Sequence, residues 1–158
     1  MINKKELAAA VHNSVKNRLS NMGWKYNSND ERFVVETGAK GKDLLIPLII
    51  VVHEQQEVLQ VLSKLPFTIP DNKKVEAAIT ISATNSKILN GSFDFDISTG
   101  EITFRLSTGY HGGGLSPEVI QYMVLVTCST VDFYNDKLFD MATGKITWQE
   151  YYDRINKK

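Results

Sequence analysis

The apolar residues near the start of the chain recur every three or four positions between Lys4 and Met22. Charged residues such as Lys5 and Lys16 fill positions between them. This period places the apolar side chains along one side of a helix. We therefore expect an amphipathic helix that is ended by Gly23 and whose buried side consists of Leu7, Val11, Val15, Leu19 and Met22.

Between Trp24 and Pro70, short runs of β-branched and apolar residues alternate with turn-forming segments at 27–30, 38–41 and 53–56. This alternation predicts three or four antiparallel strands. Pro47 lies inside the strand predicted for residues 44–52, and proline cannot donate a ladder hydrogen bond. We expect that strand to lie at an edge of the sheet or to be bulged at Pro47.

A second helix is predicted to begin after Pro70, with Asp71 as its N-cap. Its apolar positions form a narrow stripe of mostly small residues, which would permit close packing. The stripe consists of Val75, Ala78, Ile79, Ser82 and Ala83.

Residues 91–106 alternate so strictly that they predict a β-hairpin with one apolar and one polar face. We place the turn at residues 98–101 and expect the apolar face to lie on the core. The predicted facing pairs are Phe93 with Leu106, Phe95 with Phe104 and Ile97 with Ile102 on the apolar face, and Asp94 with Arg105 and Asp96 with Thr103 on the polar face.

A third helix is predicted from Pro117 to about Phe139, with Ser116 as its N-cap. Its principal apolar side consists of Ile120, Met123, Val124, Thr127, Val131, Tyr134 and Leu138. Further apolar residues widen this arc to about 200°, although about 100° is enough for a helix that faces one core. These further residues are Tyr122, Val126 and Phe133.

Something besides the sheet should therefore cover Tyr122, Val126 and Phe133. They are candidates for the surface that meets a partner protein or a second copy of the chain. The alternative is coverage within the chain by a short helix predicted from Thr147 to Ile155. The covering side chains of that helix would be Trp148, Tyr151 and Tyr152.

Composition narrows the class of protein. The length of 158 residues fits one domain, residues 1–158, which can bury roughly 70% of its unfolded surface. Eighteen basic and eighteen acidic residues cancel without clustering, which disfavours binding to nucleic acid or to an anionic membrane.

The single cysteine, Cys128, excludes an intrachain disulfide and fits the cytoplasm. We expect neither a signal peptide nor a membrane span, since no apolar run is long enough.

The predicted elements give an α+β fold: an antiparallel sheet with helices packed on one side, in the order α-β-β-β-α-β-β-α followed by a C-terminal helix. One stretch of the chain also carries a recurrent pattern: Asn85 in a helix, Gly91 and Phe93, Asp96, Gly100 in the turn, Ile102, and Phe104 with Arg105. This pattern resembles that of the YbjN family of bacterial proteins, whose fold is that of type III secretion chaperones. The resemblance is specific from residue 75 to residue 139 and holds only in outline before that.

The resemblance implies a function among proteins. The YbjN family is described as sensory-transduction regulators and largely lacks assigned chemistry. Type III secretion chaperones are homodimers that hold unfolded effector segments, so the resemblance implies protein binding and a homodimer, by analogy of fold. This chain is neutral, whereas those chaperones are typically acidic, which counts against a secretion chaperone in the strict sense.

Motifs that resemble catalytic or metal sites are each incomplete. His53 begins a segment similar to a zinc-protease helix, but Glu57 stands where the second histidine is needed. The aspartates at 94 and 96 resemble a calcium loop, but Arg105 replaces its bidentate glutamate. We expect no metal and no cofactor.

The loop from Gly109 to Gly114 contains the candidate ligand residues His111, Gly112, Gly113 and Gly114. It is similar to the oxyanion loop of lipases, but the chain lacks the Gly-x-Ser-x-Gly nucleophile motif. It could bind an anion at the start of the following helix, or it could be a flexible connector.

We interpret Cys128 as a buried structural cysteine, because no basic residue lies between residues 117 and 136.

These observations predict a non-enzymatic protein-binding or regulatory module of the YbjN type, chaperone-like and homodimeric. The alternative is a small-ligand or anion sensor that uses the Gly109 to Gly114 loop. A hydrolase that uses His111 or Cys128 ranks third, because neither residue has a partner at a recognisable spacing.

Overall fold

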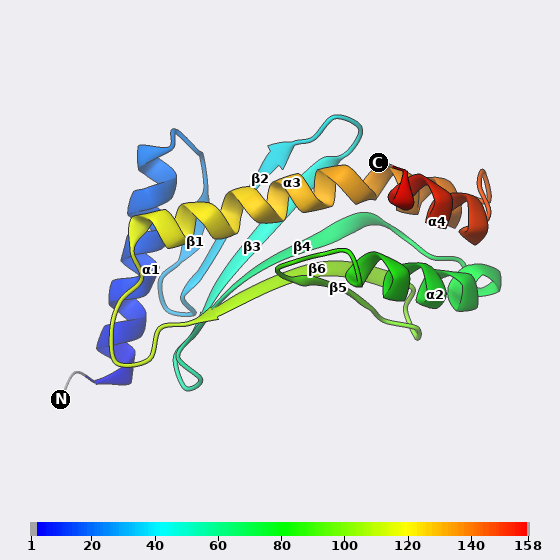
Figure 1. Ribbon diagram of the computed structural model, residues 1–158. Helices are drawn as coiled ribbons and strands as arrows, with labels where there is room; N and C mark the ends of the chain where they lie inside the picture. The colour runs from blue at the N-terminus through cyan, green and yellow to red at the C-terminus, as the bar shows by residue number, and fades with distance from the viewer. Residues whose placement is uncertain (1–2, 158) are drawn as a thin grey trace.

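The computed structural model describes residues 3–157, which form an α+β fold (Figure 1). The elements in chain order are α1 (Lys4–Asn21), β1 (Asn27–Asn29), β2 (Val34–Lys40), β3 (Leu45–His53), β4 (Val58–Thr68), the 3-10 turn η1 (Asp71–Lys73), α2 (Lys74–Asn85), β5 (Ser92–Phe95), β6 (Glu101–Gly109), α3 (Pro117–Ala142) and α4 (Trp148–Asn156).

The strands form one antiparallel six-stranded sheet in the order β1-β2-β3-β4-β6-β5. In the three central strands, alternate residues are buried and the intervening ones are half-buried or exposed. This period of two means that only one face of the sheet is covered. The predicted fold class, an antiparallel sheet with helices on one side, is confirmed.

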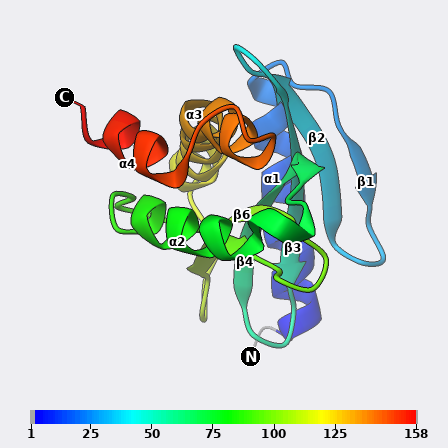
Figure 2. The same ribbon diagram turned by 90° about the vertical axis from the view of Figure 1, so that its right-hand side faces the viewer.

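The helices pack over the covered face, and α3 lies beside α4 on that side of the sheet (Figure 2). The first helix agrees with the prediction, because Leu7, Val11, Val15 and Leu19 are all buried and Asn3 caps its start. It packs against α3 and β3, whereas α2 packs against β5 and α4. The buried apolar side chains of all these elements form one cluster.

The prediction that the strand containing Pro47 lies at an edge of the sheet is wrong for the strand as a whole but holds locally. The strand that contains it, β3, lies inside the sheet between β2 and β4. However, the ladder between β3 and β4 begins only at the pair Ile49 and Leu62, so Pro47 has a partner, Gly38, on one side alone. The missing N–H is tolerated because β3 is locally an edge at this position. The turn predicted at 27–30 also begins later, at Asp30, because residues 27–29 form β1.

The hairpin of β5 and β6 has the predicted faces but a different register. Phe93 faces Phe104 and Phe95 faces Ile102, so each predicted pair is displaced by two residues. The cause is Asp96, whose side chain accepts hydrogen bonds from the backbone N–H groups of Ser98 (2.8 Å) and Thr99 (3.3 Å). This Asx-type turn places the loop at residues 97–100, one position earlier than predicted. A displacement of two keeps the paired residues of both strands on their predicted faces.

Two further pairs change with that register. Ile97 does not face Ile102; it lies in the turn with 59% of its surface exposed. Asp94 lies directly opposite Thr103, yet it still binds Arg105 diagonally through two hydrogen bonds of 2.7 and 3.1 Å.

The second helix packs with a different face from the predicted one. Its buried residues are Ala77, Thr80, Ile81 and Thr84, whereas Val75 is 72% exposed and Ile79 is 45% exposed. Burial of the threonines is possible because their hydroxyls donate to carbonyls one turn earlier in the helix, at 2.7 Å from Thr80 and 2.8 Å from Thr84. Asp71 is not the N-cap; it lies in η1 and forms an ion pair with Lys74.

The third helix agrees closely with the sequence prediction, although it continues to Ala142. Ser116 accepts a hydrogen bond from the N–H of Val119 and so caps its start. All seven residues of its predicted principal side are buried: Ile120, Met123, Val124, Thr127, Val131, Tyr134 and Leu138.

Candidate protein-binding site

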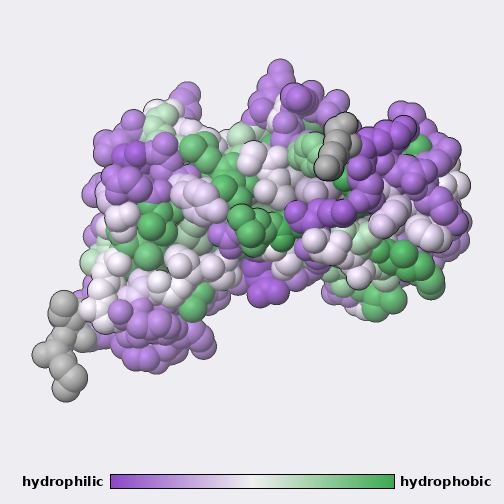
Figure 3. Space-filling view, viewed as in Figure 1, coloured by the Kyte–Doolittle hydropathy of each residue, from purple (hydrophilic) through white to green (hydrophobic). Residues whose placement is uncertain are grey.

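Large apolar side chains remain exposed on the outer side of α3. Tyr122 is 48% exposed and Phe133 is 53% exposed, with Val126 half-buried between them. Leu89, in the loop between α2 and β5, is fully exposed at 100%. We call these four residues, Leu89, Tyr122, Val126 and Phe133, the α3 patch. Figure 3 shows apolar surface along the middle of α3.

The α3 patch borders a groove of about 370 Å³ between α3 and the loop that follows α2. The side-chain amide of Asn90 donates to the hydroxyl of Tyr122 at 3.4 Å and links the two walls. The lining residues are Lys87, Ile88, Leu89, Asn90, Tyr122, Val126, Ser129, Thr130, Phe133 and Tyr134. Concave, mostly apolar sites with few polar groups are typical of binding sites.

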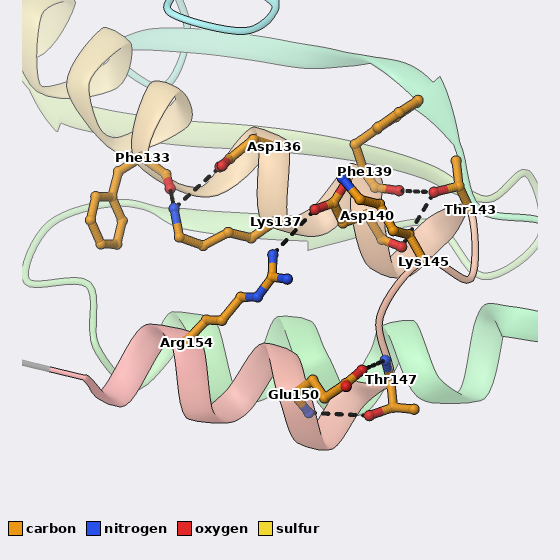
Figure 4. A network of polar contacts seen from close by, with 10 residues as sticks. All are labelled: Phe133, Asp136, Lys137, Phe139, Asp140, Thr143, Lys145, Thr147, Glu150 and Arg154. Carbon is orange, nitrogen blue, oxygen red and sulfur yellow. Dashed lines mark hydrogen bonds and ion pairs between the residues drawn. The ribbon is translucent and has the colours of Figure 1, made fainter.

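Neighbouring side chains hold the ring of Phe133 in place. Tyr134 meets it edge-to-face with the ring centroids 4.8 Å apart, and the ammonium of Lys137 lies 4.3 Å from its centroid. Lys137 in turn donates to the carbonyl of Phe133 and to the carboxylate of Asp136 (Figure 4). An anchor that is ordered before binding loses less conformational freedom when a partner arrives.

The C-terminal helix does not cover the α3 patch. It is attached at the far end of α3, where Arg154 contacts the carboxylate of Asp140 and Thr147 caps the start of α4 (Figure 4). Tyr151 is fully buried, and its hydroxyl lies 2.5 Å from that of Thr84 in α2. Coverage by this helix, the alternative that the sequence left open, is therefore wrong, because α4 packs on α2 and on the far end of α3 and leaves Tyr122 and Phe133 exposed.

Leu89 is a residue of the α3 patch that sequence reasoning missed. It lies 33 positions before Tyr122, and no helical or strand period connects the two. A signal was present, since the segment Ile88-Leu89 places two large apolar residues just before the turn residues Asn90 and Gly91. A large apolar residue beside such a turn indicates exposed apolar surface when the neighbouring elements leave it no core position.

The candidate ligand loop lies between β6 and α3. His111 is exposed, and its Nδ1 lies 3.0 Å from the carboxylate of Glu57. The N–H of Gly113 donates to the carbonyl of Tyr110, which closes a turn. A carboxylate beside the histidine opposes an anion at this place, and anion binding by this loop stays a prediction.

Cys128 is half-buried on α3. Burial, and to a smaller extent the charge of Asp132, raises the pKa of its thiol to about 11. The thiol is therefore protonated near neutral pH, which is the opposite of an activated nucleophile. Within residues 3–157, no group of three or more His, Cys, Asp and Glu side chains could hold a metal ion.

No helix in the described part of the chain has the length and apolar character needed to cross a membrane.

Comparisons with known proteins give the fold. No protein-family model and no curated protein matches the sequence. Among solved structures, a chain of the ExsC–ExsE complex is similar with a TM-score of 0.61 and 13% identity, over 84% of this chain and 96% of that one. YbjN from E. coli is similar with a TM-score of 0.61 and 10% identity, over 85% of this chain and 93% of YbjN.

A chain of the HopA1–SchA chaperone–effector complex is also similar, with a TM-score of 0.50 and 11% identity, over 78% of this chain and 91% of that one. The fold predicted from the resemblance to YbjN and to type III secretion chaperones is thereby confirmed. At such low identity the likeness establishes the fold alone.

Proposed function

We propose that this protein is a non-enzymatic protein-binding module, chaperone-like or regulatory, and that a segment of a partner protein docks on the α3 patch. The observation that carries the proposal is the pair of half-exposed aromatic residues Tyr122 and Phe133 beside the groove. Aromatic side chains in a partly enclosed apolar site are typical anchors of protein interfaces.

The structural neighbours support the same function. One is a chain of the ExsC–ExsE complex and another is a chain of a chaperone–effector complex, so two similar folds occur in association with other proteins. These associations support a role of this fold as a surface on which a protein segment can lie. We extend this property to the present chain as a proposal, together with a homodimeric state and a cytoplasmic setting.

The groove indicates the chemistry of the docked segment. Most of its described lining is apolar or uncharged, and Lys87 carries the one charge among these residues. A partner segment with one or two large apolar side chains and an acidic residue next to them would complement this lining. The apolar side chains would pack against Phe133 and Leu89, and the acidic group would approach Lys87.

The test is in-cell crosslinking followed by mass spectrometry, with the wild type, Phe133→Glu and a matched control. A carboxylate at position 133 would be one helical turn from Lys137, so we expect the variant to fold. The control is Ile97→Glu, because Ile97 is exposed to a similar degree (59%) but lies in the hairpin turn.

We expect a crosslinked partner peptide near α3 with the wild type and with Ile97→Glu, and its loss with Phe133→Glu. A partner that Phe133→Glu retains at the wild-type level would contradict the α3 patch as the docking surface. Recovery of crosslinks between copies of this chain alone would contradict the proposed heterologous partner.

A further inference from the structure

Asn85, the last residue of α2, forms two hydrogen bonds with a single residue of β5. Its side-chain amide donates to the carbonyl of Phe93 at 2.9 Å, and its side-chain carbonyl accepts from the N–H of Phe93 at 2.8 Å. A residue of a neighbouring antiparallel strand would offer the same donor and acceptor to Phe93. The Asn85 amide thus reproduces the hydrogen bonding of one residue of an additional strand.

The ladder between β5 and β6 identifies the side on which Asn85 binds. The N–H of Asp96 donates to the carbonyl of Glu101 at 2.9 Å, so these two residues form a hydrogen-bonded pair. Such pairs alternate along an antiparallel ladder, and the pair Phe93 and Phe104 is therefore a non-hydrogen-bonded one. The backbone groups of Phe93 consequently point away from β6, toward the free edge of the sheet.

We propose that Asn85 occupies the strand-addition site on β5 and closes this edge of the sheet to extended segments and to a second copy. β5 has four residues, and only Phe93 and Phe95 turn their backbone groups to the free edge. With Phe93 satisfied, Phe95 alone remains, and one residue does not support a ladder. The other edge strand, β1, is protected because it has three residues and all of them are polar.

A closed β5 edge is independent of the proposed function, and it distinguishes between two modes of protein binding. Strand addition to a sheet edge would use backbone hydrogen bonds, whereas docking on the α3 patch uses side chains. When the β5 edge is closed, docking on the α3 patch remains available to partner segments and strand addition to β5 does not. Closure of this edge also removes a common route to aggregation for an open sheet.

The test compares the wild type with Asn85→Ala and with a matched control, Ser86→Ala. Ser86 is the next residue, is exposed and donates only within its own helix turn, to the carbonyl of Ala83. We expect the amide of Phe93 to exchange with solvent about tenfold faster in Asn85→Ala, the factor set by loss of one hydrogen bond. The amide of Phe104 points away from β5, because Phe93 and Phe104 form a non-hydrogen-bonded pair. It should therefore keep its wild-type exchange rate in all three proteins.

The second readout is binding of a fluorescent peptide with the sequence of residues 101–109, of which residues 102–105 pair with β5 in the native sheet. We expect Asn85→Ala to bind it, and the wild type and Ser86→Ala not to bind it. A peptide methylated on alternate backbone nitrogens should bind none of them, because it cannot form a ladder. Near-ultraviolet circular dichroism confirms that each variant is folded.

Faster exchange at Phe93 without peptide binding would overturn the proposal, because Asn85 would then only anchor α2. Unchanged exchange at Phe93 would overturn it as well. If Asn85→Ala does not fold, Asn85→Ser decides, since its short side chain cannot bond both backbone groups of Phe93. Peptide binding by Asn85→Ser supports the closed edge, and absence of binding overturns it.

Discussion

Gly100 lies where the hairpin turn passes closest to the end of β4. Its φ is +77°, and a Cβ atom at this position would lie 2.3 Å from the carbonyl oxygen of Ile69. Gly91 is equally constrained, with φ of +87° and a Cβ atom that would lie 2.5 Å from the ring of Phe104. The positive φ and the close contact of a Cβ atom both favour glycine at these positions. These two residues of the YbjN-like pattern therefore build the hairpin.

The same holds for the other residues of that pattern. Asn85 binds β5, Asp96 forms the turn and Arg105 pairs with Asp94, while Phe93 and Phe104 pack in the core. A resemblance carried by such residues predicts a fold and gives no information about a site. This is the physical reason why the sequence predicted the architecture and no activity.

At the scale of single residues we predict that Cys128 reacts slowly with iodoacetamide. Its pKa of about 11, against 9.0 for an ordinary thiol, makes the thiolate about 100-fold less abundant at pH 8. We expect alkylation of the native protein to be about 100-fold slower than alkylation in urea, as measured by intact mass spectrometry.

The pH profile provides the control for Cys128. The native rate should rise tenfold per pH unit toward about pH 11, whereas the rate in urea should level off above pH 9, near the ordinary pKa. Equal rates in the native and unfolded proteins at pH 8 would contradict the raised pKa.

At the scale of elements, the hairpin and α2 show how far a pattern alone can predict. Alternation fixes which face of a strand is buried, but it is unchanged by a shift of two residues. The Asp96 turn decided the register, and its effect depends on backbone geometry that the pattern does not contain. In α2, apolarity favoured Val75 and Ile79, yet the hydroxyls of Thr80 and Thr84 are satisfied within the chain and can be buried.

We predict a pH-dependent link between α1 and the turn after β1. Hydrogen bonds from Lys16 and His12, both 2.9 Å long, hold the pKa of the Asp30 carboxyl well below its usual value of 3.8. A lowered pKa in the folded state means that this stabilisation is fully present above the unfolded value. It is lost as the pH falls through the folded pKa.

Asp30→Asn should therefore lower the urea midpoint at pH 7, and the difference from the wild type should shrink as the pH falls below 3.8. Urea denaturation of both proteins from pH 2 to pH 7 measures this difference. A difference that is constant across the range would show that the charge of Asp30 does not contribute.

At the scale of the whole molecule, the candidate site was predicted in part. The width of the apolar arc of α3 indicated Tyr122, Val126 and Phe133 as residues that its own sheet does not cover, and two of them are half exposed. Sequence did not predict Leu89, because its position next to α3 depends on the packing of α2. Whether the Gly109 to Gly114 loop binds a ligand stays a prediction.

A second uncovered apolar surface lies on α2, separate from that of α3 (Figure 3). Val75 and Ile79 are exposed there, one turn apart, with the small residues Ala78 and Ser82 beside them. Small residues permit the close approach of a second helix, and a homodimer would place this surface against its own copy. We therefore expect dimerisation through α2.

Sedimentation velocity should show a concentration-dependent dimer for the wild type. Val75→Glu combined with Ile79→Glu should weaken it by more than about tenfold, because two apolar contacts are lost and like charges meet across the axis. Tyr122→Glu should leave the dimer intact. A monomeric wild type at every concentration would contradict the prediction, and loss of the dimer in Tyr122→Glu would move the interface to the α3 patch.

The strand order carries a consequence for how the chain reaches this structure. Strands β1 to β4 pair as successive hairpins, and β5 pairs with β6 as another, so each block forms from neighbouring segments. Within residues 3–157, the ladder between β4 and β6 is the one that joins the two blocks of strands, with Val58 paired to Gly109 across all of α2 and β5. Closing so long a loop is the slow, non-local step of folding. Until α3 packs over the ladder between β4 and β6, both blocks of strands expose their apolar faces. The chain is most prone to aggregate at that stage.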